Sequence, residues 1–436
     1  MTSKIQLFCL ATFVALLVST NVWASSGYVT GTLQFYNHLG SYCPSSGTVD
    51  CTGAKYLEAV YHTYRPVRYA TVTLVGVINQ GANETVYSIG EGTTNANGNY
   101  MMSWSISSQL QQIFVSNNAK FQLRWKPIHK DGRFSVRSST GAQYFLWGSI
   151  SSLTNGTTAA SPQSLGVKRW GASGAENAIA NLYDGAVRQW VNLSVSNRMN
   201  AYFTNVKIKA MDTTCGSSSC YTAGDNTIHI NSEAKVWQQF TILHEMGHAV
   251  SYLASRDQNV AICGLYDYDG VAGHSLDSPE WACTQFEEGF ADFIGATALY
   301  SASALEPFAY CFGANACVSS NLNAETSHGI SGTCATGENR WELSTARFLW
   351  DLYDIHADYT GDTYQQATWT FIDTIHSFDN GTENGQKNEP WSSNFSGFDN
   401  KDGRSTYDYR VLYEYWHDNI TTLYTPYYAN CYPVGS

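Results

Sequence analysis

Residues 235–254 read KVWQQFTILHEMGHAVSYLA, and they carry the clearest pattern in the chain. Their apolar residues recur at three- and four-residue steps, with Phe240, Leu243, Val250 and Leu253 on one stripe. A stripe with this period is typical of an amphipathic helix that packs against a core. We therefore predict a helix over these residues.

The predicted helix contains His244-Glu245-Met246-Gly247-His248. Histidines four residues apart lie one turn apart on the same helical face, so both imidazoles can reach one metal ion. Glu245 is offset around the helix and can face the open coordination position of that ion. A buried histidine pair on an ordinary helix is the alternative interpretation of the same residues.

A catalytic zinc site needs a third protein ligand. The metzincin pattern HExxHxxGxxH is excluded, because Ser251 and Ala254 stand where that pattern has glycine and histidine. A second helix is predicted over 281–300, and Glu288 and Asp292 lie on one face of it. Glu288 can complete a His₂Glu site, and Asp292 can accept the second ring N–H of a ligand histidine.

At these residues the sequence resembles the gluzincin metallopeptidases, in which HExxH is followed by ExxxD on a second helix, as in the thermolysin-like enzymes. The resemblance implies that His244, His248 and Glu288 hold one catalytic Zn²⁺. It also implies that Glu245 is the general base and that Asp292 orients a ligand histidine. The implied activity is hydrolysis of peptide bonds in a protein or peptide substrate by a metal-activated water.

Two features depart from the family pattern or compete with it. Glu287 neighbours the expected ligand, but its residue four positions on is Ala291, so the ExxxD pattern selects Glu288. The insert between His248 and Glu288 is longer than in the shortest gluzincins. No residue is assigned to stabilise the oxyanion, for which the candidates are Tyr266, Tyr268, His274, His328, His356, Tyr407 and Tyr409.

The resemblance also implies a fold. Zincin folds place an edge strand before the ligand helix, and residues 225–231 (DNTIHIN) fit that place, with His229 expected to face outward rather than bind metal. Further strands are predicted over 206–210 and 227–230, and further helices over 175–191 and 340–353. The expected class is α+β: a zincin-type peptidase domain over 169–436, with a mixed sheet, an active-site helix and a helical C-terminal subdomain.

The N-terminal part of the chain has the two-residue period of strands. Short strands with turns between them predict an all-β sandwich over 25–147. Residues 65–74 (RPVRYATVTL) and 94–100 (TNANGNY) resemble the transthyretin-like or carboxypeptidase-regulatory type of sandwich. Such modules act as spacers, and a glycan or surface contact stays an open alternative. Ser/Thr/Gly-rich residues 148–168 predict a linker to the second domain.

Residues 1–24 have the pattern of a secretory signal peptide. Lys4 precedes an apolar stretch over 5–18, and Ala24 provides a small residue for cleavage. The mature chain is therefore expected to be secreted or periplasmic. Ten of the 11 cysteines follow the apolar stretch, and an even number in an exported protein favours disulfides. Sequence proximity suggests Cys43–Cys51, Cys215–Cys220, Cys263–Cys283 and Cys311–Cys317, which leaves Cys334 with Cys431.

Composition excludes several classes. The 436-residue chain is 43% hydrophobic, too much for a disordered protein. Its net charge of −12 and lack of a basic run exclude a nucleic-acid binder, because such a chain cannot replace the counterions around phosphate. No segment after residue 24 is apolar enough to span a membrane. Acidic loops over 266–270 and 399–402 are candidate Ca²⁺ sites without the EF-hand spacing.

Two functional hypotheses follow. The first is a secreted zinc peptidase, and the absence of a GxMEN-like motif for capturing an amine favours an endopeptidase over an aminopeptidase. The second is a secreted binding protein or adhesin that works through its β-sandwich and carries a vestigial zincin domain. The intact Glu245 argues against the second hypothesis, because loss of the base is the simplest way to inactivate such an enzyme.

Overall fold

The structure contains both helices and strands, compatible with the expected α+β class. It is a computed structural model that describes residues 25–37, 63–79, 84–170, 175–237, 239–254, 282–304, 342–355, 366–368 and 370–372. The chain divides into two compact units. Unit 1 takes its residues from 1–34, 66–126 and 145–169, and unit 2 from 35–65, 127–144 and 170–436.

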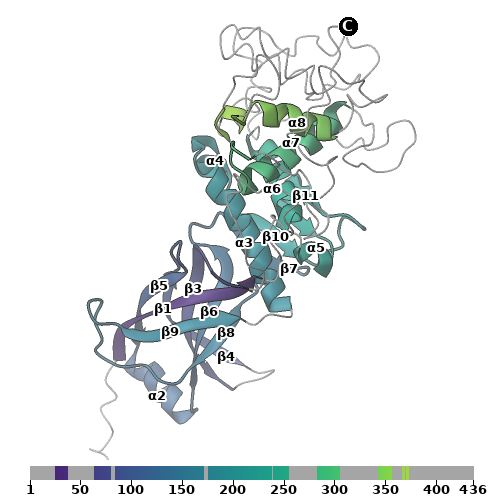
Figure 1. Ribbon diagram of the computed structural model, residues 1–436. Helices are drawn as coiled ribbons and strands as arrows, with labels where there is room; N and C mark the ends of the chain where they lie inside the picture. Colours follow the sequence, from purple (N-terminus) through teal and green to yellow (C-terminus); the bar gives the residue numbers. More distant parts are fainter. Residues whose placement is uncertain are drawn as a thin grey trace, which may run out of the picture. The chain divides into compact units, whose positions relative to one another are not determined.

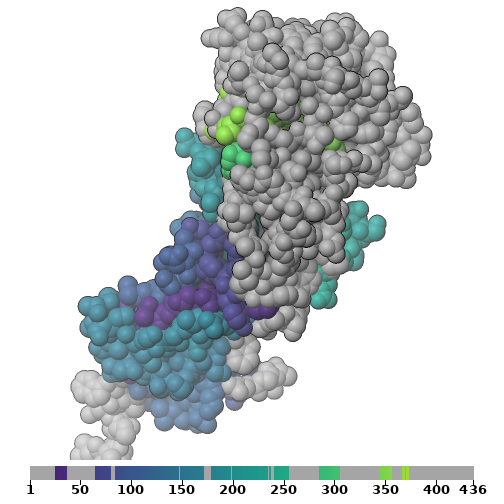
Figure 2. Space-filling view, in the orientation of Figure 1, coloured from purple at the N-terminus to yellow at the C-terminus, as the bar shows by residue number. Residues whose placement is uncertain are grey.

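Unit 1 is built on antiparallel strands. They are β1 (Ser25–Asn37), β3 (Ala70–Ile78), β4 (Thr85–Thr93), β5 (Asn99–Ile106), β6 (Lys120–His129), β8 (Leu146–Ile150) and β9 (Gln163–Trp170). They pair in the continuous order β8-β6-β3-β4-β5-β1-β9 and curl around a shared core (Figure 1). The two ends of this order approach each other, because Lys168 Nζ on β9 donates to the Ser149 carbonyl on β8 at 3.2 Å. Figure 2 shows the surface of the β1–β9 pair, with β1 in purple.

The core of unit 1 follows from the strand period. On β5, Tyr100, Met102 and Trp104 are buried and alternate with exposed residues, as expected for a strand with one face on a core. Strand β3 is buried along almost its whole length. Its second face is covered by helix α2 (Ser108–Ser116), whose Phe114 ring lies where a Cβ on Gly76 would come within 2.3 Å. A side chain at position 76 would therefore require the Phe114 ring to move.

The segment expected to be a linker, residues 148–168, instead belongs to unit 1. It contains the end of β8 and most of β9, which pairs with β1. The polar residues between these strands bind the backbone of β1: Asn155 Oδ1 accepts from the Ser26 N–H at 2.9 Å, and Thr157 Oγ1 accepts from the Tyr28 N–H at 2.8 Å. Polar side chains of this segment thus supply hydrogen bonds within unit 1.

Unit 2 contains a mixed sheet in the order β7-β10-β12-β11. Its strands are β7 (Phe134–Ser138), β10 (Val206–Ala210), β12 (Thr227–Ile230) and β11 (Cys220–Thr222). Strands β7, β10 and β12 are parallel, and β11 runs antiparallel to β12 at the edge. Residues 134–138 were expected in the N-terminal sandwich, and the structure places them in this sheet instead.

Helices supply the rest of unit 2. They are α3 (Ala175–Leu193), α4 (Asn197–Tyr202), α5 (Glu233–Trp237), α6 (Gln239–Ala254), α7 (Ala282–Leu299) and α8 (Glu342–Asp351). The helices predicted around the motifs are confirmed as α6 and α7, and the start of the first forms the separate short helix α5. Helix α3 packs on α6 and α7, and α8 packs on α7 (Figure 1). Among the described helices, none has the length and apolarity needed to cross a membrane.

Several expectations lie outside the described residues. They include the signal peptide over 1–24 and the acidic loops over 266–270 and 399–402. The Cys215–Cys220 disulfide is present and joins Cys215 to the first residue of the edge strand β11. Every other suggested disulfide includes at least one cysteine outside the described ranges.

Candidate metal centre

Close contact between α6 and α7 creates the candidate site. A Cβ on Gly247 would lie only 2.5 Å from Ala291 Cα, so the two backbones approach more closely than any side chain at position 247 would allow. One turn further along α7, a Cβ on Gly295 would lie 3.3 Å from the Phe240 ring and 3.5 Å from the backbone nitrogen of His244. The contacts advance by four residues on one helix and recede by four on the other, as expected for antiparallel helices packed along their i±4 ridges.

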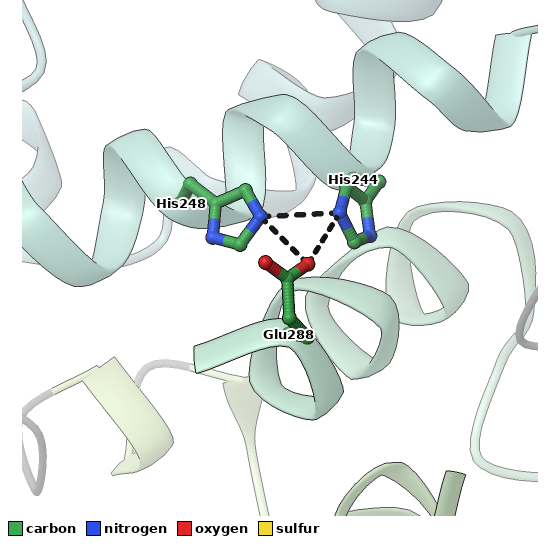
Figure 3. A group of neighbouring side chains, drawn as sticks. All are labelled: His244, His248 and Glu288. Carbon is green, nitrogen blue, oxygen red and sulfur yellow. Dashed lines mark hydrogen bonds and ion pairs between the residues drawn. The ribbon is translucent and has the colours of Figure 1, made fainter. Parts of the chain in front are cut away.

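The three expected ligands meet on a second row of the same interface. Glu288 Oε2 lies 3.1 Å from His244 Nε2 and 3.1 Å from His248 Nε2. The two Nε2 atoms lie 3.1 Å apart. Figure 3 shows the histidines on one helix and the carboxylate reaching them from the other. All three residues belong to one group of potential metal ligands, with His244 and Glu288 buried.

These donors fit a zinc ion. Three atoms that are all 3.1 Å apart can lie at one distance of about 2.0–2.1 Å from a common point, which is the usual length of zinc bonds to imidazole nitrogen and carboxylate oxygen. Two histidines and one glutamate are also a donor set found in catalytic zinc sites, where a water takes the fourth position. The spacing and the chemistry of the three donor atoms are therefore compatible with a bound zinc ion.

Asp292 fixes the orientation of His244. Its Oδ1 lies 2.7 Å from His244 Nδ1, and the aspartate is completely buried. An Nδ1–H that donates to this carboxylate leaves the Nε2 lone pair of a neutral ring directed toward His248 and Glu288. Asp292 thus contacts His244 on the ring nitrogen opposite the one that faces His248 and Glu288.

The site also has the electrostatics of a cation site. Burial alone would lower the pKa of His244, but the carboxylates of Asp292 and Glu288 outweigh burial and raise that pKa well above its usual range. Burial would also lower the pKa of His248, but the carboxylate of Glu288 outweighs burial and raises that pKa. In Glu288 the effect of burial is reversed by His248 and His244, which hold its pKa well below its usual range. Positive charge between these side chains is therefore stabilised.

Glu245 lies within electrostatic range of the group. It is buried, and its carboxylate contributes to the raised pKa of His248. It also acts on Lys235 of α5, whose pKa is lowered by burial with Glu245 opposing the shift. Lys235 is part of no sequence motif, so the sequence alone does not point to its interaction with Glu245.

Two expectations around the edge strand are wrong. Strand β12 lies between β10 and β11, so the edge of the described sheet is β11. His229 on β12 does not face outward: it is buried, with Nδ1 2.9 Å from Asp212 Oδ2 and Nε2 3.1 Å from Thr222 Oγ1. All four residues of β12 are buried, so this strand has no outward-facing side for His229 to occupy. His229 is not part of the potential metal group of His244, His248 and Glu288.

Glu287, the rival ligand, is bound elsewhere. Its Oε2 accepts from the Ser251 hydroxyl at 2.7 Å. From the sequence alone, Ser251 serves only to exclude the metzincin pattern. Small residues at four-residue steps, Gly247 on one helix and Ala291 and Gly295 on the other, are a sequence pattern that could have revealed the contact. All seven oxyanion candidates lie outside the described residues.

Comparisons with known proteins do not identify the chain. No family model and no curated protein matches the sequence. Among solved structures, a match to a 9R-lipoxygenase from Cyanothece PCC8801 covers 41% of this chain and 23% of that chain, at 11% identity and a TM-score of 0.18. A likeness at that level carries no argument about fold or function.

Proposed function

We propose that this chain is a secreted zinc-dependent peptidase of the gluzincin type. The observation that carries the proposal is the convergence of His244 Nε2, His248 Nε2 and Glu288 Oε2, all 3.1 Å apart, from two helices. Glu245 is buried beside these residues, and Asp292 binds one of them from behind. Each of the five residues thus matches a distinct role in a catalytic zinc site: ligand, general base or hydrogen-bond partner of a ligand.

The side chains divide the work as follows. His244, His248 and Glu288 would hold the ion, and Asp292 would keep His244 in the tautomer that directs Nε2 inward. When bound, zinc lowers the pKa of a water to about 7 and polarises a carbonyl group. Glu245 would accept a proton from that water and return it to the leaving amine. The residue that stabilises the oxyanion is not assigned.

The substrate proposal is an extended protein segment cut internally. Among the described strands β11 pairs only with β12, and an edge strand can accept a peptide as a further strand. An endopeptidase is favoured over an aminopeptidase because the sequence has no GxMEN-like motif for a substrate amine. The N-terminal β unit would serve as a spacer or as a contact to glycans or surfaces.

The proposal is tested by comparing the wild-type chain with Glu245→Gln, which keeps the shape of the side chain and removes the base. We expect both proteins to bind one zinc per chain in metal analysis after dialysis. We expect only the wild type to cleave a panel of denatured proteins, with a loss of at least about a hundred-fold in the variant. Equal cleavage by the two proteins would contradict a peptidase and leave the binding-protein hypothesis.

A further inference from the structure

Ser251 and Glu287 form a hydrogen bond between α6 and α7 next to the metal centre. The Ser251 hydroxyl donates to Glu287 Oε2 at 2.7 Å, and the serine is 1% exposed. Ser251 lies one helical turn beyond His248, and Glu287 directly precedes Glu288. The bond therefore joins the two helix segments that present these two ligands.

The bond continues the contact row formed by glycine and alanine. Gly247 meets Ala291, and four residues further along α6 and four residues back along α7 the facing pair is Ser251 and Glu287. At the first pair the two backbones touch, which fixes the distance between the helices there. At the second pair a charge-assisted hydrogen bond takes over, and such bonds are short, directional and roughly twice as strong as neutral ones.

We propose that Ser251 is a positioning residue for the metal centre, acting by holding Glu287. The bond fixes the rotation of the α7 turn that carries Glu288, so that Oε2 of Glu288 stays within 3.1 Å of both imidazoles. It also keeps the Glu287 carboxylate bound to the Ser251 hydroxyl, so that Glu288, and not its neighbour Glu287, serves as the ligand. This inference rests on the proposed function, since it takes the group to hold zinc.

Three variants test the bond. Ser251→Ala and Glu287→Ala each remove it, whereas Glu287→Gln keeps an oxygen that can accept from the serine hydroxyl. We expect zinc affinity, measured by competition with a chromophoric chelator, to fall about ten-fold in each alanine variant, as for other outer partners of metal ligands. Glu287→Gln should recover part of this loss, and the double alanine variant should bind zinc no more weakly than either single variant.

Replacing zinc by Co²⁺ gives a spectroscopic signal that a loss of folding stability alone would leave unchanged. The visible absorption of Co²⁺ reports the number and geometry of its ligands, so the alanine variants should show an altered band and Glu287→Gln a band close to the wild type. Ser196→Ala is the matched control, since Ser196 is equally buried and caps α4 through a bond from the Met199 N–H at 3.3 Å. That variant should unfold more easily yet bind zinc with wild-type affinity.

The outcomes separate the inference from the proposed function. Wild-type zinc affinity in Ser251→Ala, or independent and additive losses in the double variant, would overturn the inference while leaving the peptidase proposal intact. A wild-type chain that binds no zinc would overturn both. If Ser251→Ala does not fold, the comparison of Glu287→Ala with Glu287→Gln at a half-buried position decides the question.

Discussion

Replacing Gly247 by alanine should open the metal centre without touching any of its ligands. The added methyl group would lie 2.5 Å from Ala291 Cα, 2.8 Å from its carbonyl oxygen and 3.0 Å from its Cβ, whereas ordinary contact begins at 3.4 Å. All three atoms belong to the backbone or to Cβ, so no side-chain rotation relieves the overlap. The helices must therefore separate by about 0.9 Å at this point, the difference between 3.4 and 2.5 Å.

A displacement of this size exceeds what zinc tolerates. Metal–ligand distances stay within about 0.2 Å of their usual values, so moving Glu288 with α7 would take its carboxylate out of bonding range. We expect zinc affinity to fall at least about a hundred-fold, as much as the largest effects of losing an outer hydrogen-bond partner. The free energy of unfolding should change less, because overpacking costs about 1–3 kcal/mol and alanine gains about 1 kcal/mol over glycine in a helix.

Gly295→Ala is the matched control on the same interface. Its methyl group would lie 3.3 Å from the far end of the Phe240 ring, which can move by the few tenths of an ångström required. Zinc competition titrations and urea unfolding of both variants provide the comparison, and we expect Gly295→Ala to bind zinc as the wild type does. Equal affinities in the two variants would refute the argument that backbone contact at Gly247 places Glu288.

Three further predictions concern other contacts. Asp292→Ala should weaken zinc binding by about 10–100-fold, measured by the same titration, and Asp292→Asn should weaken it less because the amide oxygen still accepts from the imidazole. Burial lowers the pKa of His129 to about 4 from 6.5, so the unfolded chain gains a proton that the folded chain lacks as the pH falls from 6.5 toward 4. The free energy of unfolding should therefore drop by up to about 3 kcal/mol over that range in urea titrations, a drop that His129→Phe removes. His229→Ala should speed hydrogen exchange in β11 more than in β7, since it deletes the links of β12 to Asp212 and Thr222; equal protection of β11 in variant and wild type would contradict that role.

The sequence predicts well the helices and the grouping of His244, His248 and Glu288, because both depend on local spacing. Helix α7 was expected over 281–300 and occupies Ala282–Leu299, and α8 was expected over 340–353 and occupies Glu342–Asp351. The four-residue spacing of HxxxH matches that of ExxxD because both are steps along packed i±4 ridges. A pattern in each helix therefore specifies which residues face each other across the interface.

The parts that the sequence did not predict depend on contacts between distant segments. Strand β7 lies between β6 and β8 in the chain, yet it pairs in parallel with β10, about 70 residues away. No local period marks such a pairing. Strand β11 has only three residues, too few to show alternation, so the edge of the sheet was assigned to its neighbour β12.

The interleaved assignment of the chain to its two units has a practical consequence for anyone who dissects this protein. A recombinant fragment starting near residue 169, the natural choice from composition alone, would leave out β7 and expose the N–H and C=O groups along one side of β10. Such a bare strand invites intermolecular pairing and inclusion bodies. Expression work should therefore keep residues 127–144 in the same polypeptide as the helices that carry the histidines and the glutamate.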